Sequence, residues 1–188
     1  MYGFGETPHP DHPLTLDDYA TGVRDLLDAS GIEETILVAH SFGGRVALRL
    51  AAKDPRVKGL VLIDSAGMPP RRSLGYYIRV FSYKLAKRFG IEKKGAGSAD
   101  YAALSGAMRR TFVNIVNTSS VADAKSITVP TLLLWGEKDA DTPLYMCRRL
   151  RRLIRGSEAV VLRGAGHFSY LERAGEAYRI VRAFCRSI

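Results

Sequence analysis

The chain has 188 residues, of which 46% are hydrophobic, and a formal net charge of +9. This length fits one domain with a substantial core, which excludes a disordered chain. No segment approaches the roughly 18 consecutive apolar residues of a membrane span, and the first residues lack the basic and apolar regions of a signal peptide. These features predict a soluble, cytoplasmic protein.

The positive charge is unevenly distributed. Residues 1–34 carry eight acidic residues against one arginine, a net charge of −7, so the remainder carries +16. Leucine and isoleucine recur at core-facing spacing between the arginines of 148–155, which indicates one face of a solvated helix. No nucleic-acid-binding motif accompanies the charge, so we expect no nucleic-acid partner, and a membrane surface is the weaker expectation. Cys147 and Cys185 lack metal-ligand spacing, so we expect reduced structural thiols and no metal site.

The first third of the chain has the pattern of a parallel α/β sheet. Short apolar runs have the length of buried strands, and amphipathic segments precede and follow the first of them. Strand, helix and strand in this order require a right-handed crossover between parallel strands. The predicted elements are a helix over 15–30, a strand over 35–40, a helix over 43–53 and a strand over 57–65.

From residue 68 the pattern changes to two amphipathic helices, marked by Ile78, Phe81, Leu85 and Phe89 and then by Tyr101, Leu104, Met108, Phe112 and Ile115. Strand-like runs return within 129–139 and 158–167, separated by a basic helix near 143–155, and a final helix has Ala177, Ile180, Val181 and Phe184 on one face. We therefore predict a core formed by 1–67 and 126–188, interrupted by a helical insert at 68–125.

A turn between the first predicted strand and the next helix carries Ser41. A serine hydroxyl is a poor nucleophile unless it is exposed and has an adjacent base. A tight strand-to-helix turn provides the exposure but needs small residues two before and two after the serine, here Ala39 and Gly43. The helix also directs its N-terminal amides to this point, where negative charge would develop.

The segment AHSFGG resembles the nucleophile elbow of the α/β-hydrolase superfamily, with Ala39 where that family usually has glycine. The family's catalytic residues follow in the order serine, acid, histidine, and LLLWGEKDADTP and GAGHFSYLE resemble the later two motifs with Asp139 and His167. The resemblance implies a partial α/β-hydrolase fold: a mostly parallel sheet with flanking helices and a helical cap over the pocket.

Other assignments are open at several of these positions. Glu137, Asp141 or Asp64 could replace Asp139 as the acid, and Ser41 could be a helix cap. By the resemblance, the Phe42 amide binds the oxyanion. We expect His40 and Phe168 to line the substrate site, with His40 lining the pocket or packing rather than acting as a base.

The resemblance covers only the later part of the family's pattern, which predicts an N-terminally shortened chain. The oxyanion hole would then lack its upstream donor, and losing one donor typically costs about 10²–10³ in rate. Ile36, Leu37 and Val38 would lie on an exposed apolar sheet edge, which favours self-association. We therefore expect the 188-residue monomer to hydrolyse model esters poorly.

The function predicted from these residues is a serine hydrolase that cleaves a small-molecule ester or similar acyl substrate through an acyl-enzyme, with no cofactor. Within the resemblance, the alternatives are an aminopeptidase, a carbon–carbon bond hydrolase and a haloperoxidase. A different class of alternative is a non-catalytic binding protein with the same fold.

Overall fold

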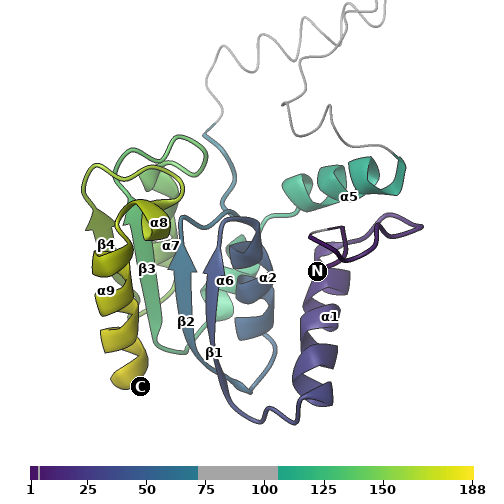
Figure 1. Ribbon diagram of the computed structural model, residues 1–188, viewed down its shortest axis with the longest axis horizontal. Coiled ribbons are helices and arrows are strands. Elements are labelled where there is room, and N and C mark those ends of the chain that lie inside the picture. Colours follow the sequence, from purple (N-terminus) through teal and green to yellow (C-terminus); the bar gives the residue numbers. More distant parts are fainter. Residues whose placement is uncertain (4, 72–105) are drawn as a thin grey trace, which may run out of the picture.

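The computed structural model describes residues 1–3, 5–71 and 106–188. In these ranges the chain forms a parallel sheet in the order β1-β2-β3-β4, with helices on both faces (Figure 1). The strands are β1 (Thr35–His40), β2 (Val57–Ile63), β3 (Thr131–Gly136) and β4 (Glu158–Leu162). The helices are α1 (Leu16–Ala29), α2 (Phe42–Ala51), α5 (Gly106–Asn117), α6 (Val121–Ser126), α7 (Leu144–Leu153), α8 (Ser169–Glu172) and α9 (Ala174–Arg186).

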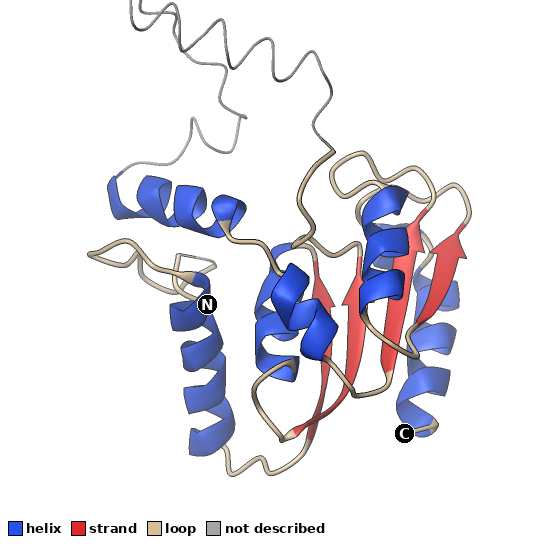
Figure 2. Ribbon diagram, turned by 180° about the vertical axis from the view of Figure 1, so that it is seen from behind, coloured by secondary structure: helices blue, strands red, loops and turns tan. Residues whose placement is uncertain are grey.

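The two central strands are buried on both faces because helices cover both. Successive side chains of a strand point to opposite faces, so alternate residues enter different cores. Leu60, Leu62, Leu133 and Trp135 pack with α2, α6 and α7, whereas Val61, Ile63, Leu132 and Leu134 pack with Ala177 and other residues of α9. Figure 2 shows α2, α6 and α7 on the side of the sheet opposite α9.

Helix α1 begins where its capping residues predict. The Thr15 hydroxyl accepts a hydrogen bond from the Asp18 amide, and the Asp18 carboxylate accepts one from the Thr15 amide. Gly31 follows the helix with φ of 61°, a left-handed conformation that glycine adopts without strain. Leu16, Tyr19 and Ala20 pack on α2 together with Ile115 of α5.

The predicted strands and the helices around them are confirmed with shifts of a few residues at their ends. Short helices α6 and α8 were not predicted, because segments of six and four residues are too short to show a helical stripe. The expected helix at Ile78–Phe89 and the start of the one at Tyr101 lie outside the described residues, whereas Met108, Phe112 and Ile115 belong to α5.

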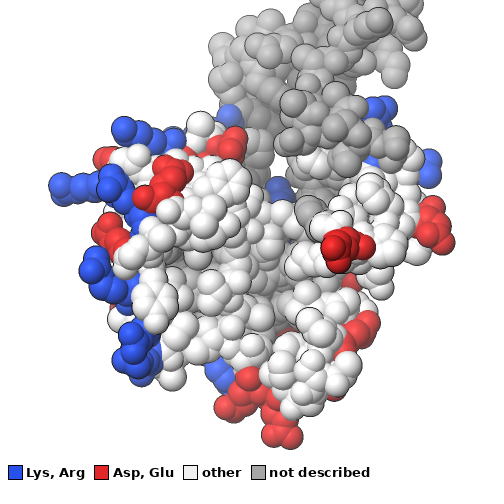
Figure 3. All heavy atoms as spheres, in the orientation of Figure 1, with Lys and Arg blue, Asp and Glu red and all other residues white. Residues whose placement is uncertain are grey.

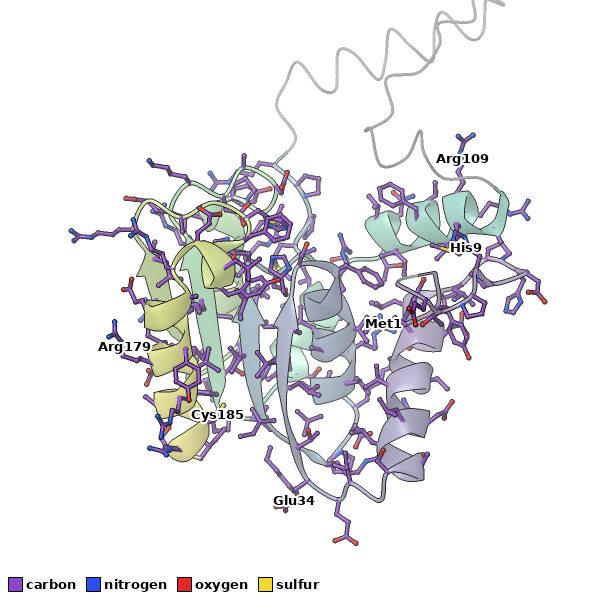
Figure 4. All side chains as sticks on the ribbon, viewed as in Figure 1. Met1, His9, Glu34, Arg109, Arg179 and Cys185 are labelled. Carbon is purple, nitrogen blue, oxygen red and sulfur yellow. The ribbon has the colours of Figure 1, made fainter. Side chains whose placement is uncertain are left out.

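Charge separates across the described part of the molecule, and the acidic side is the one expected from residues 1–34. Acidic residues gather at the α1 end and basic residues along the α9 side, where Arg179 points away from the sheet (Figures 3 and 4).

Both cysteines are free thiols, and burial raises the pKa of Cys147 to about 11. Among the described helices, none combines the length and apolarity needed to cross a membrane.

Candidate active site

Ser41 lies directly after β1, at the first turn of α2. Its backbone has φ of 49° and ψ of −115°, a conformation that residues other than glycine rarely adopt. Such strain costs on the order of 1–3 kcal/mol and persists only where surrounding contacts hold it. The Ser41 amide donates to Ile63 O at 3.1 Å, and Ser41 O accepts from the amides of Gly44 and Ala66, each at 3.0 Å.

The side chain of Ser41 makes no capping hydrogen bond to α2. Its Oγ instead lies 2.9 Å from Nε2 of His167, which follows β4. On the other side of the imidazole, Nδ1 lies 3.0 Å from Oδ2 of Asp139, which follows β3. The structure thus brings together three side chains that are up to 126 positions apart in sequence, at the edge where all strands have their carboxyl ends (Figure 1).

The positions of the protons in these two hydrogen bonds can be inferred from Asp139, the acceptor at one end. An ionised carboxylate can only accept hydrogen bonds, so Nδ1 of His167 donates to Asp139. Nε2 of a neutral imidazole is then an acceptor, and the Ser41 hydroxyl donates to it. This is the direction of hydrogen bonding that draws the proton away from the serine oxygen.

The Asp139 loop holds its carboxylate ionised. Although burial alone would raise the pKa of Asp139, hydrogen bonds from Thr142 and His167 lower it below the usual value. The Thr142 hydroxyl lies 2.6 Å from Oδ2, and the amides of Asp141 and Thr142 both donate to Oδ1 at 2.9 Å. Trp135 Nε1 donates to Thr142 O at 2.6 Å and anchors the loop to the sheet. From the sequence Thr142 is expected only as part of a helix cap with Pro143, whereas the amide of Asp141 donating to Asp139 is the turn that aspartate commonly forms.

Two of the three alternative acids have other partners, and the third is exposed. Glu137 accepts from the Gly164 amide at 2.8 Å, and the side chain of Asp141 is exposed. Asp64 is fully buried, and its carboxylate accepts from the amide of Gly136 and from the amide and hydroxyl of Ser169. Of these carboxylates, the one hydrogen-bonded to His167 belongs to Asp139.

His40 and Phe168 lie beside the imidazole of His167. His40 Nε2 donates to the carbonyl oxygen of His167 at 2.8 Å, and its ring centre is 4.8 Å from that of His167. His40 therefore packs and holds the histidine loop, one of the two roles predicted for it. Phe168 is 52% exposed, so its ring remains accessible to a ligand. The Phe42 ring contacts Tyr19 edge-on, with centroids 5.1 Å apart.

Two glycines permit close approach of the segments around the site. A Cβ at Gly44 would lie 2.0 Å from the Ser65 hydroxyl oxygen, whereas one at Gly43 would meet Ala39 at an ordinary 3.8 Å. The tightest contact of the turn is therefore at Gly44, one position later than the steric argument predicts. A Cβ at Gly136 would lie 2.0 Å from Gly166 O, so the two loops that carry Asp139 and His167 touch through their backbones.

One group of side chains in the described residues has the spacing of a metal site. Ligand atoms of Asp139, Asp141 and His167 lie within 4.8 Å of one another. Nδ1 of His167 and Oδ2 of Asp139 already share a hydrogen bond, so a cation here would have to displace it. The geometry therefore fits proton transfer better than metal binding.

A model of the alpha/beta hydrolase family matches residues 1–179. The chain belongs to this family. Its sequence is 27% identical over 207 residues to 2-hydroxy-6-oxo-2,4-heptadienoate hydrolase of Pseudomonas putida, covering 97% of this chain and 74% of that protein. It is 29% identical over 212 residues to 2-hydroxymuconate semialdehyde hydrolase of a Pseudomonas species, covering 98% and 74%.

A solved structure of another family member has the same fold. The meta-cleavage product hydrolase from Pseudomonas fluorescens matches with a TM-score of 0.74 and 24% identity, over 100% of this chain and 78% of that one. At this identity the likeness shows the fold alone. It agrees with the partial α/β-hydrolase fold predicted from the sequence.

Proposed function

We propose that this family member is a serine hydrolase in which Ser41 is the nucleophile, His167 the general base and Asp139 the group that orients His167. The observation that carries the proposal is the imidazole of His167, which is hydrogen-bonded to Ser41 through one nitrogen and to Asp139 through the other. A serine that only caps a helix has no need of either contact.

The proposed reaction begins with attack of Ser41 Oγ on the carbonyl carbon of an ester. As the C–O bond forms, the serine proton passes to Nε2 of His167, and the carbonyl π electrons move to the oxygen. The oxyanion collapses, the bond to the leaving alkoxide breaks, and His167 returns the proton to that alkoxide. Water then attacks the acyl-enzyme by the same route and releases the acid and Ser41.

Electrostatic support for the oxyanion is proposed at the start of α2. The amides at a helix N-terminus carry partial positive charge, and the Phe42 amide comes directly after the nucleophile. Asp139 stabilises the imidazolium that forms in each step. Phe168 and His40 are proposed to border the acyl site. The part of the predicted insert that precedes α6 is proposed to form its cap, because α6 itself packs in the core with Leu60 and Leu133.

Covalent labelling with a fluorophosphonate tests the nucleophile directly, because the reagent needs an activated serine and remains detectable even when turnover is slow. We expect a single adduct on Ser41 in the wild-type chain, none in Ser41→Ala, and wild-type labelling in Ser187→Ala, whose exposed hydroxyl bonds Phe184 O. A folded wild-type chain that stays unlabelled would contradict the proposal and favour a non-catalytic binding protein.

A second candidate reaction is hydrolysis of a carbon–carbon bond. The two relatives described above are named 2-hydroxy-6-oxo-2,4-heptadienoate hydrolase and 2-hydroxymuconate semialdehyde hydrolase, and the matches cover nearly the whole chain. Comparing kcat/KM for a p-nitrophenyl ester with that for 2-hydroxy-6-oxohepta-2,4-dienoate separates the two. A higher value for the ester supports the first proposal, and a higher value for the dienoate supports the second.

A further inference from the structure

Asp64 is a buried carboxylate at the centre of the site that takes no part in the proposed proton transfer. It follows β2 directly, has no solvent exposure, and adopts a φ of 43°. Among the described residues no cationic side chain forms an ion pair with it, and burial raises the pKa of Asp64. Such a group is costly to bury unless its oxygens accept hydrogen bonds.

The hydrogen bonds of Asp64 reach both loops that meet at Ser41. Oδ1 accepts from the Gly136 amide at 2.7 Å, at the point where β3 passes into the Asp139 loop. Oδ2 accepts from the amide of Ser169 at 3.3 Å and from its hydroxyl, two residues after His167. One carboxylate therefore ties the start of one loop to the end of the other.

The backbone of Asp64 adds a third contact. Its carbonyl oxygen lies 2.9 Å from the hydroxyl of Thr142, the same hydroxyl that lies 2.6 Å from Asp139. Because β1 and β3 are the neighbours of β2, a residue at the end of β2 lies between the serine that follows β1 and the acid that follows β3.

We propose that Asp64 is a positioning residue that fixes the Asp139 and His167 loops relative to each other, and that the alignment of the imidazole with Ser41 depends on it. This inference rests on the proposed function for its kinetic consequences. Its structural content, the alignment of His167 with Asp139, can be measured without any turnover.

The test compares Asp64→Ala and Asp64→Asn with Asp54→Asn. Asp54 is a buried carboxylate that precedes the same strand, is paired with Arg56 and lies away from the site, so its variant controls for lost stability. Because a displacement of about 1 Å can cost on the order of 10²-fold in rate, we expect Asp64→Ala to lower kcat by about that factor with little change in KM. Asp64→Asn retains the acceptor for Gly136, so it should recover most of the loss, and Asp54→Asn should keep the wild-type kcat.

The proton on Nδ1 of His167 provides a readout independent of activity. We expect its downfield proton NMR resonance in the wild-type chain and in Asp54→Asn, and its loss or displacement in Asp64→Ala. If Asp64→Ala does not fold, Ser169→Ala removes one donor to Oδ2 and should produce a smaller effect of the same kind. A folded Asp64→Ala with the wild-type resonance and kcat overturns the inference. An unlabelled Ser41 with an Asp64-dependent resonance overturns the proposed function and leaves the inference standing.

Discussion

Hydrogen bonds from Thr142 help to keep the Asp139 carboxyl ionised. Its hydroxyl and amide both donate to the carboxylate and help to lower the pKa of Asp139. A lowered carboxyl pKa contributes stability that is present above the group's ordinary pKa and is lost as the pH falls through the folded-state value. The site therefore derives part of its acid tolerance from a residue outside the Ser41, His167 and Asp139 side chains.

Replacing Thr142 with valine should weaken this effect. Thr142→Val keeps the shape but removes the hydroxyl donor, so the pKa of Asp139 rises, and the titration of its carboxyl carbon, followed by NMR, moves to higher pH. We also expect a loss of about 1–3 kcal/mol in unfolding free energy at pH 7, since the hydrogen bond goes to a charged group. Thr118→Val, which removes a hydroxyl bound to Asn114 O, is the control. An Asp139 carboxyl that titrates at the same pH in both variants and the wild type would refute the prediction.

Helix α2 follows Ser41 directly and also hydrogen-bonds to the C-terminal end of α5. Arg45 of α2 donates from Nη1 to Ile115 O at 3.0 Å and to Thr118 O at 2.7 Å, at the C-terminus of α5. The last turn of α5 contains no basic residue of its own. Arg45 therefore supplies, from a neighbouring helix, the positive charge that a helix C-terminus favours.

We expect Arg45→Met to loosen α5 while leaving the sheet intact. Losing hydrogen bonds from a charged donor to the carbonyl oxygens should cost about 1–3 kcal/mol in unfolding free energy. Urea unfolding measures this loss, and hydrogen exchange should show faster exchange in α5 than in β2. Arg110→Met, on the exposed side of α5, should leave both measurements unchanged. Equal stability of Arg45→Met and the wild type would argue against this role.

One edge of the sheet, at β1, is left partly exposed in the described residues. In the described residues β1 pairs only with β2, and Val38 in its middle is 52% exposed. Figure 3 shows a largely uncharged surface between the acidic and basic sides. We propose that two copies pair through their β1 edges. The unpaired backbone N–H and C=O groups of β1 in one copy can hydrogen-bond to those of β1 in the other, in a symmetric contact.

A charge on this strand should oppose the association. We expect Val38→Lys to shift the sedimentation profile of the chain towards the monomer, because pairing would bring two lysines together at an apolar interface. Val113→Lys places the same charge at an exposed valine on α5 and should sediment like the wild type. A wild-type chain that remains monomeric at high concentration would rule out the pairing.

The local helices and strands, and the order of the serine, acid and histidine motifs along the chain, could be predicted from the sequence alone. Capping at Thr15, the buried runs of the strands and the turn at Ser41 are local signals, since each depends on neighbours within a few residues. The family motifs then identified Asp139 and His167 as partners for Ser41. Parallel strands have their carboxyl ends at the same end of a sheet, so residues that follow different strands are brought together there.

The groups that support these residues depend on contacts between segments that are distant in the chain. The contacts of Asp64 with Gly136 and Ser169 join residues 72 and 105 positions apart, and Arg45 reaches carbonyls 70 and 73 positions away. A sequence pattern records periodicity along the chain, whereas these hydrogen bonds depend on how neighbouring loops approach one another in space. For the same reason the tight approach at Gly44, set by Ser65 on the next loop, became visible only once the strands were side by side.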